Sequence, residues 1–290
     1  MQSIWSAQQI RGARPYQEDF FAVVENNAIY YKGERIPLGE NSVPAHHSMY
    51  ILADGMGGMG HGDVAAEKVL EEFINSYISL NNGTQSLRNK FSASLTSANR
   101  SISSLIQNDP ELEGMGSTFV AVLANNDNDT LQWISVGDSP LWLVRKGNLK
   151  RLNEIHTIRE INQKQRQKKQ AVLVDEQEEE EIGHYLASAI TGDELEYIDS
   201  PDKATPLKHG DIIILASDGM ETLPPYVIET IATGHLDEIL NTNDNELAFN
   251  YVNKIRAELI EKIISLDNEE QDNTTLIVSI FLDNQYSVAK

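Results

Sequence analysis

Residues 49–62 constrain the fold of this chain most strongly, because an apolar segment there is followed by an aspartate and then by several glycines. Residues 49–53 are apolar and typical of a buried strand, Asp54 ends the segment, and glycine recurs from Gly55 to Gly62. A strand holds a carboxylate at its end in a fixed position. Glycine has no Cβ, so backbone groups beside it can approach a ligand closely. The segment therefore predicts a cation site at the end of a core strand.

Amphipathic helices are predicted wherever apolar residues recur at helical spacing. The first lies directly after the glycines, because the apolar residues over 66–78 form one stripe of a 3.6-residue period. The polar residues 81–84 that follow are typical of a helix end and a new N-cap. Further helices are predicted over 87–105, near 226–232 and over 248–263.

Most of the other apolar segments pair as hairpins across short polar turns. The predicted hairpins join 19–24 to 28–31, 117–124 to 131–136, and 141–144 to 149–152. Two further strands are predicted over 210–216 and 276–282. A strand–helix–strand alternation does not recur, so a doubly wound parallel sheet is not expected. The pattern predicts an α+β fold in which mainly antiparallel sheets form a sandwich with helices packed outside.

The whole chain, 1–290, is expected to form one domain with an exposed flap at about 153–188. Apolar periodicity weakens there, residues 161–170 are basic and polar, and residues 175–181 are acidic. Charge runs of this kind are typical of solvated helix faces and exposed loops. Too few apolar residues are available in this stretch to build a separate core.

Composition restricts the class of protein. The formal net charge is −21, and such an acidic surface repels phosphate backbones and anionic lipid. We therefore expect no nucleic-acid or membrane partner, although the charge can equally serve solubility alone. The chain has no cysteine, which excludes disulfides, thiolate–zinc sites and a cysteine nucleophile. No uncharged apolar span of about 18 residues and no secretory signal is evident, so a cytoplasmic protein and a monomer are expected.

Several aspartates stand where apolar strands begin or end, and carboxylates gathered in one cleft repel one another unless a cation neutralises them. All-oxygen carboxylate sites select Mg²⁺ or Mn²⁺, and two such ions can activate water for phosphoryl displacement. For any one aspartate, a turn or a helix cap is the simpler interpretation. The residues concerned are Asp54, Asp138, Asp218 and Asp272, with Glu18 and Asp19 beside them.

Arg14 is a candidate for phosphate binding, since a guanidinium presents a planar fork to two phosphate oxygens. The alternative interpretation of Arg14 is an ordinary ion pair with Glu18 or Asp19.

Taken in order, these motifs resemble the metal-dependent type 2C (PPM) serine/threonine protein phosphatases, in particular their bacterial branch. The resemblance extends from about residue 5 to residue 282. Its motifs are Arg14-Pro15-Tyr16-Gln17-Glu18-Asp19, Asp54-Gly55-Met56-Gly57-Gly58, Gly116-Ser117-Thr118, Gly137-Asp138-Ser139, Ser217-Asp218-Gly219 and Asp272-Asn273.

The resemblance implies a four-layer α-β-β-α sandwich and hydrolysis of phosphoserine or phosphothreonine by water activated between two Mn²⁺ or Mg²⁺ ions. It implies that Asp54 bridges the ions and that the Gly55 carbonyl binds one of them. Asp218 and Asp272 would complete the coordination of the other ion, and Arg14 would bind the substrate phosphate. Glu18 and Asp19 would hold metal-bound waters, and Asp138 would hold a weaker third ion with Asp218.

The chain departs from the family pattern at two places near the implied third ion. Thr222 stands where many relatives have a second aspartate, and Pro140 stands where they have an arginine. The implied partners are phosphorylated proteins and a serine/threonine kinase that shares these substrates. The alternative from another class is a catalytically inactive PPM-fold module that binds phosphoproteins or regulates. Cysteine-dependent phosphatases are excluded by composition, and the metal-binding motifs of calcineurin-like enzymes are absent from the sequence.

Overall fold

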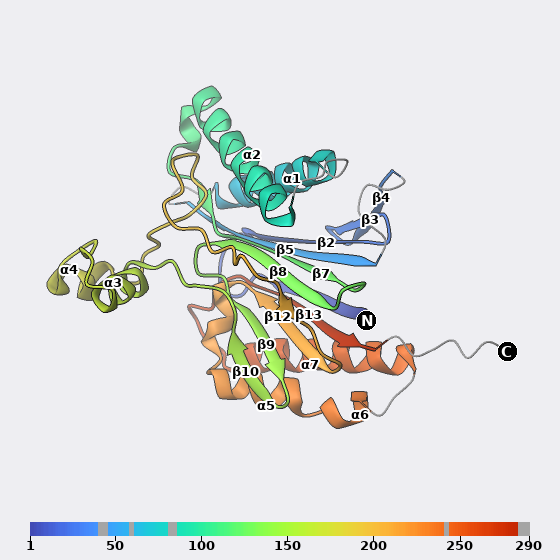
Figure 1. Ribbon diagram of the computed structural model, residues 1–290. Helices are drawn as coiled ribbons and strands as arrows, with labels where there is room; N and C mark the ends of the chain where they lie inside the picture. The colour runs from blue at the N-terminus through green and yellow to red at the C-terminus, as the bar shows by residue number, and fades with distance from the viewer. Residues whose placement is uncertain (40–45, 58–60, 81–85, 241–243, 284–290) are drawn as a thin grey trace.

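The computed structural model describes residues 1–39, 46–57, 61–80, 86–240 and 244–283. Two antiparallel β-sheets lie face to face, and helices cover the outer face of each sheet (Figure 1). The predicted α+β fold, a four-layer α-β-β-α sandwich, is confirmed. Residues 58–60 of the glycine segment and the predicted cap signal at 81–84 lie outside the described ranges. No helix within those ranges is long and apolar enough to cross a membrane.

The two sheets differ in size. The smaller one has the spatial order β1 (Gln2–Ile10), β13 (Thr274–Leu282), β12 (Asp211–Ala216), β9 (Leu141–Arg145) and β10 (Asn148–Arg151). The larger one has the order β11 (Thr205–Pro206), β8 (Thr130–Val136), β7 (Phe119–Asn125), β5 (His47–Met56), β2 (Asp19–Glu25), β3 (Ala28–Tyr31) and β4 (Glu34–Pro37), and β6 (Gly116–Ser117) pairs with the end of β5.

Helices α1 (Gly62–Ser79) and α2 (Leu87–Asn108) cover the larger sheet. The smaller sheet is covered by α5 (Pro225–Thr233), α6 (Leu236–Leu240) and α7 (Asn245–Ser265). Helices α3 (Ile158–Gln167) and α4 (Glu176–Ile182) project from one end of the sandwich, within the stretch predicted as a flap (Figure 1). Two short 3₁₀ turns complete the described elements, η2 (Pro110–Leu112) and η3 (Asp218–Thr222).

Strand β5 is buried on both faces, and its alternation positions Asp54. Met49 and Ile51 pack in the cluster beneath α1, whereas Tyr50 and Leu52 belong to the cluster between the sheets. Because successive side chains of a strand point to opposite faces, Asp54 lies on the same face as Tyr50 and Leu52. The strand therefore directs the Asp54 carboxylate toward the space between the two sheets.

The predicted helices and hairpins are present, with three differences. Strand β5 continues through Asp54 to Met56, because Gly55 and Met56 pair with β6. Strand β1 was not predicted, since its residues are largely polar and its partner β13 is distant in the chain. Strand β4 was not predicted either, because its residues are exposed and no apolar alternation marks it.

A buried hydrogen bond joins the two sheets and generates a prediction. The hydroxyl of Tyr50 on β5 lies 2.8 Å from the hydroxyl of Ser279 on β13. Tyr50→Phe is expected to lower the free energy of unfolding by about 1–2 kcal/mol, because Ser279 loses its partner. Urea denaturation measures the loss, and Tyr226→Phe, at a tyrosine that is 71% exposed, is the control.

The double variant Tyr50→Phe/Ser279→Ala removes both hydroxyls, so most of the lost stability should return. A double variant that is less stable than Tyr50→Phe alone would contradict the bond's assigned role.

Candidate functional site

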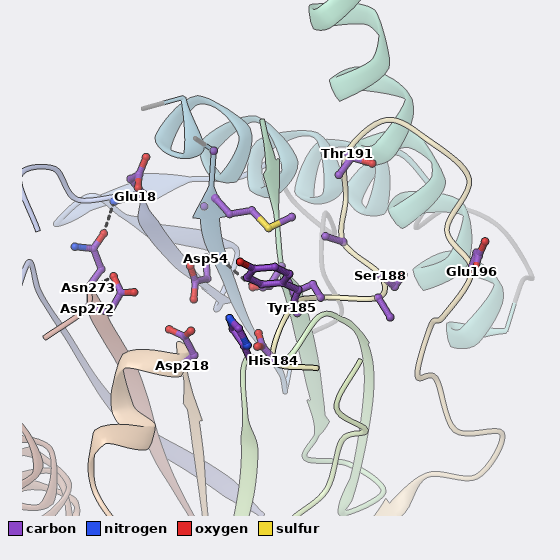
Figure 2. A pocket seen from close by; sticks show the side chains of 18 of the residues that line it. Glu18, Asp54, His184, Tyr185, Ser188, Thr191, Glu196, Asp218, Asp272 and Asn273 are labelled. Carbon is purple, nitrogen blue, oxygen red and sulfur yellow. Dashed lines mark hydrogen bonds between the residues drawn. The ribbon is translucent and has the colours of Figure 1, made fainter. Parts of the chain in front are cut away.

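A cavity of about 690 Å³ opens at the edge of the sandwich where the loops of both sheets meet. Figure 2 shows Asp54, Asp218 and Asp272 gathered on one side of it, with His184 and Tyr185 entering from the other. The predicted site residues that line the cavity are Arg14, Glu18, Asp54, Gly55, Asp138, Asp218 and Asp272. Asp19 is the predicted residue that does not line it.

Asp19 lies directly behind the cavity, opposite Asp54 on the neighbouring strand. The two residues are paired in the antiparallel register of β2 and β5. The Asp19 side chain is 1% exposed, and its Oδ2 accepts a hydrogen bond of 2.8 Å from the Ser217 hydroxyl. Its Oδ1 is buried without a hydrogen-bond partner. Two carboxylates directly opposite on neighbouring strands repel each other, so this pair costs stability when both are charged.

The pKa values of these carboxyls show how crowded the site is. Burial, followed by repulsion from Asp19, Asp218 and Asp138, raises the pKa of Asp54 well above its usual range. Burial raises the pKa of Asp19 to about 6, although hydrogen bonds oppose the shift. Burial and the neighbouring Asp138 and Asp272 raise the pKa of Asp218 to about 7. The outer face of Asp218 is open to solvent, which weakens these repulsions.

This donor set fits a divalent cation. Each group is a hard carboxylate oxygen, the partnerless Oδ1 of Asp19 is buried among them, and the charge is in excess. Within the described ranges, no three acidic or histidine side chains already stand close enough to enclose one ion. Asp272 is instead paired with Arg14. Ion binding would therefore draw the side chains inward or add water ligands.

Gly55 and Gly62 permit the close packing of strand β5 against the start of α1. A Cβ added to Gly55 would meet the Gly62 carbonyl oxygen at 2.1 Å. Glu18 fastens the same junction, because its backbone carbonyl accepts from the Gly55 N–H at 3.1 Å and its Oε1 accepts from the Gly62 N–H at 3.2 Å. In this structure Gly55 thus allows the start of helix α1 to pack closely against strand β5. That the Gly55 carbonyl binds a metal ion stays a prediction.

Arg14 lies at the mouth of the cavity and forms an ion pair with Asp272. An ion pair of Arg14 is thus present, as the alternative interpretation expected, but its partner is Asp272 rather than Glu18 or Asp19. The Arg14 side chain is 55% exposed, so it can still reach a ligand. Asn273 organises the loop that carries Arg14, because its Nδ2 donates to the carbonyl oxygens of Arg11 and Tyr16.

Several residues of the site were not predicted. His184 and Tyr185, in ring contact at 4.3 Å, line the cavity from the segment after α4. Glu194 and Glu196 line it from the segment that leads back to the larger sheet. No local pattern marks these residues, since the long connection around α3 and α4 brings them to the cavity. Arg151, which is partly buried and donates to the backbone carbonyl of Asp138, also escaped the sequence analysis.

The crowding of carboxylates generates a prediction on stability and pH. A carboxyl with a raised pKa binds its proton more tightly when folded, so stability present below the unfolded pKa is lost as pH rises through the folded pKa. For Asp19 this window runs from 3.8 to about 6.

Asp54→Asn is expected to raise the free energy of unfolding in EDTA at about pH 8, by on the order of 1 kcal/mol, because one repelling charge disappears. The gain should shrink toward about pH 4, where the raised pKa values of Asp19, Asp54 and Asp218 leave these carboxyls protonated in the wild type. Urea denaturation across this range measures it, with Glu180→Gln on the exposed helix α4 as the control. A variant less stable than wild type at the higher pH would contradict the account.

Comparison with known proteins shows which family the chain resembles. A model of protein phosphatase 2C matches residues 21–189. The serine/threonine protein phosphatase PstP of Mycobacterium tuberculosis is 29% identical over 254 residues, which cover 85% of this chain and 43% of PstP. The protein phosphatase PhpP of Streptococcus pneumoniae is 30% identical over 181 residues, which cover 62% of this chain and 70% of PhpP. This chain thus spans less than half the length of PstP.

Solved structures show the same fold. The catalytic domain of PstP in complex with two manganese ions has a TM-score of 0.64 at 24% identity, covering 97% of this chain and 99% of that one. The serine/threonine phosphatase of S. agalactiae has a TM-score of 0.63 at 22% identity, covering 97% of this chain and 100% of that one. Because the matched segment 21–189 is more than half of the 290 residues, the chain belongs to the protein phosphatase 2C (PPM) family, as its motifs predicted.

Proposed function

We propose that this chain is a metal-dependent protein serine/threonine phosphatase that hydrolyses phosphoserine and phosphothreonine. The observation that carries the proposal is the facing pair of Asp19, which is buried, and Asp54, which lines the cavity together with Asp218 and Asp272. Repulsion between these carboxylates destabilises the fold, and a bound cation is the simplest feature that would offset it. The exposed guanidinium of Arg14 beside the same cavity adds a group suited to phosphate.

Two Mn²⁺ or Mg²⁺ ions are the proposed cofactors, as in the PstP complex with two manganese ions. The residues proposed to hold them are Asp54, Gly55, Asp218 and Asp272 directly, Glu18 and Asp19 through water, and Asp138 for a weaker third ion. When bound, the ions would supply Lewis-acid chemistry that activates water as a nucleophile and offsets phosphate charge.

The chain's own residues position the reacting groups. Arg14 would bind two oxygens of the substrate phosphate, which would compete with Asp272 for its guanidinium. Ser217 fixes Asp19, because its hydroxyl donates to Asp19 and accepts from the Thr275 N–H at 2.9 Å. These contacts join the two sheets at the site, so the carboxylates keep their places during turnover.

The proposed substrates are phosphorylated proteins, and dephosphorylation opposite a partner serine/threonine kinase is the proposed signalling role. The net charge of −21 opposes binding of nucleic acid or an anionic membrane surface. We also propose a cytoplasmic monomer in which residues 1–290 form one phosphatase domain, with a flap at about 153–188. An inactive phosphoprotein-binding module is the alternative, and the presence of Asp54, Asp218 and Asp272 at one cavity disfavours it.

Hydrolysis of a phosphothreonine peptide tests the proposal. Phosphate release should require Mn²⁺ or Mg²⁺, and Asp54→Asn and Asp218→Asn should each lower kcat/KM by roughly 10³-fold or more, because a central ligand is lost. Asp202→Asn, at a side chain that is 77% exposed, is the matched control. Wild-type protein that binds the peptide but releases no phosphate with either metal would favour the inactive module.

Arg14 generates a separate prediction. Arg14→Ala is expected to raise KM for the phosphopeptide by roughly 10-fold or more, because the phosphate loses a charged, bidentate partner. Steady-state kinetics measure the change, and Arg35→Ala on the exposed strand β4 is the control. An unchanged KM would assign Arg14 to the ion pair with Asp272 alone.

A further inference from the structure

Arg151 places a nearly buried guanidinium at the Asp138 end of the site. It ends strand β10, and its side chain is 16% exposed. Nη1 donates to Glu221 Oε1 at 2.8 Å, and Nη2 donates to the backbone carbonyl of Asp138. Nε donates to Asn153 Oδ1 at 3.3 Å. All three nitrogens of the guanidinium are therefore hydrogen-bonded, and one of them lies at Asp138, which lines the cavity.

Three carboxylates, those of Asp138, Asp218 and Glu221, lie at this end of the site, and the positive charge of Arg151 acts on two of them, Asp138 and Glu221. Asp138 and Glu221 both repel Asp218, which begins the turn η3 that also carries Glu221. Burial raises the pKa of Asp138 and of Glu221, and the charge of Arg151 opposes both shifts. A divalent cation placed among these carboxylates would meet the same positive charge.

The centre of the site differs from its two ends. Arg14 pairs with Asp272 at one end, and Arg151 pairs with Glu221 at the other. Among the ion pairs found in the described part of the chain, none involves Asp19 or Asp54. The two arginines thus place permanent positive charge at Asp272 and at Glu221, and leave Asp19 and Asp54 to be neutralised by other means.

We propose that Arg151 is a built-in counter-ion that takes the electrostatic place of a divalent ion at Asp138 and Glu221. Tight ion binding is thereby confined to the centre around Asp54, and a third ion at Asp138 is weak because it would be repelled by the guanidinium. The inference rests on the proposed function in one respect, namely that divalent ions bind at Asp54.

A purely structural role for Arg151 is the competing explanation, since it could serve only to hold the Asp138 turn. The turn is, however, also held by hydrogen bonds of the Asn153 side chain. Asn153 Nδ2 donates to the Ser139 carbonyl at 2.9 Å, and the Leu141 N–H donates to Asn153 Oδ1 at 2.8 Å. The test therefore needs a measurement that responds to charge rather than to folding.

The experiment counts Mn²⁺ ions by isothermal titration calorimetry and by the electron paramagnetic resonance of free Mn²⁺. Wild type should bind two ions tightly, and Asp138→Asn should leave that number unchanged. Arg151→Met removes the charge and keeps much of the length, so a third ion should bind roughly tenfold tighter or more. Arg151→Met/Glu221→Gln should lose this gain. Arg166→Met, which removes a charge from the ion pair with Glu179 on the projecting helices, is the control.

The outcomes separate this inference from the proposed function. Wild type that binds no Mn²⁺ would overturn both. Wild type that binds two ions, with no tighter third ion in folded Arg151→Met, would overturn the counter-ion role alone. Circular dichroism checks folding, and Arg151→Lys should keep the wild-type count because it keeps the charge. If Arg151→Met does not fold, a tightly bound third ion in wild type that disappears in Asp138→Asn overturns the inference, and its absence supports it.

Discussion

Repulsion between Asp19 and Asp54 is the constraint on which the arrangement of the site depends. The two carboxylates face each other across β2 and β5, and strand alternation directs Asp54 into the space between the sheets. Elsewhere that space is filled by apolar side chains such as Leu52 and Phe281. A charged pair can persist there only because many apolar contacts and the bond between Tyr50 and Ser279 hold the sheets together.

Different neighbouring groups hold the Asp19–Asp54 pair in place and supply positive charge around it. A hydrogen bond from the Ser217 hydroxyl fixes one oxygen of Asp19, and the close packing of Gly55 against Gly62 brings the start of α1 near the site. Among the described residues, arginines form ion pairs at the two ends of the site, with Asp272 and with Glu221. The carboxylates of Asp19 and Asp54 therefore retain the negative charge that a divalent ion requires. The repulsion that destabilises the fold is thus the same feature that would bind the ions of the proposed reaction.

Local patterns in the sequence predict those parts of the fold that depend on local physics. Hairpins, amphipathic helices and the Asp-Gly strand ends follow from periodicity and turn residues, and the ordered motifs identify the family. Contacts between distant segments leave no such pattern. Strand β1 pairs with β13, which lies at the other end of the chain. The ion pairs of Arg14 with Asp272 and of Arg151 with Glu221 likewise join residues that are distant in the sequence. The same reason hides His184 and Tyr185, which the connection around α3 and α4 brings to the cavity.

The central claim is that cations resolve the repulsion at Asp54, and anomalous diffraction from crystals grown with Mn²⁺ tests it most directly. The account predicts two strong manganese peaks, with the Asp54 carboxylate in contact with both, and Asp218 and Asp272 drawn toward one of them. Saturating Mn²⁺ that leaves no peak beside Asp54 would contradict it. The paired carboxylates would then have to persist through protonation alone, and the proposed chemistry would lose its basis.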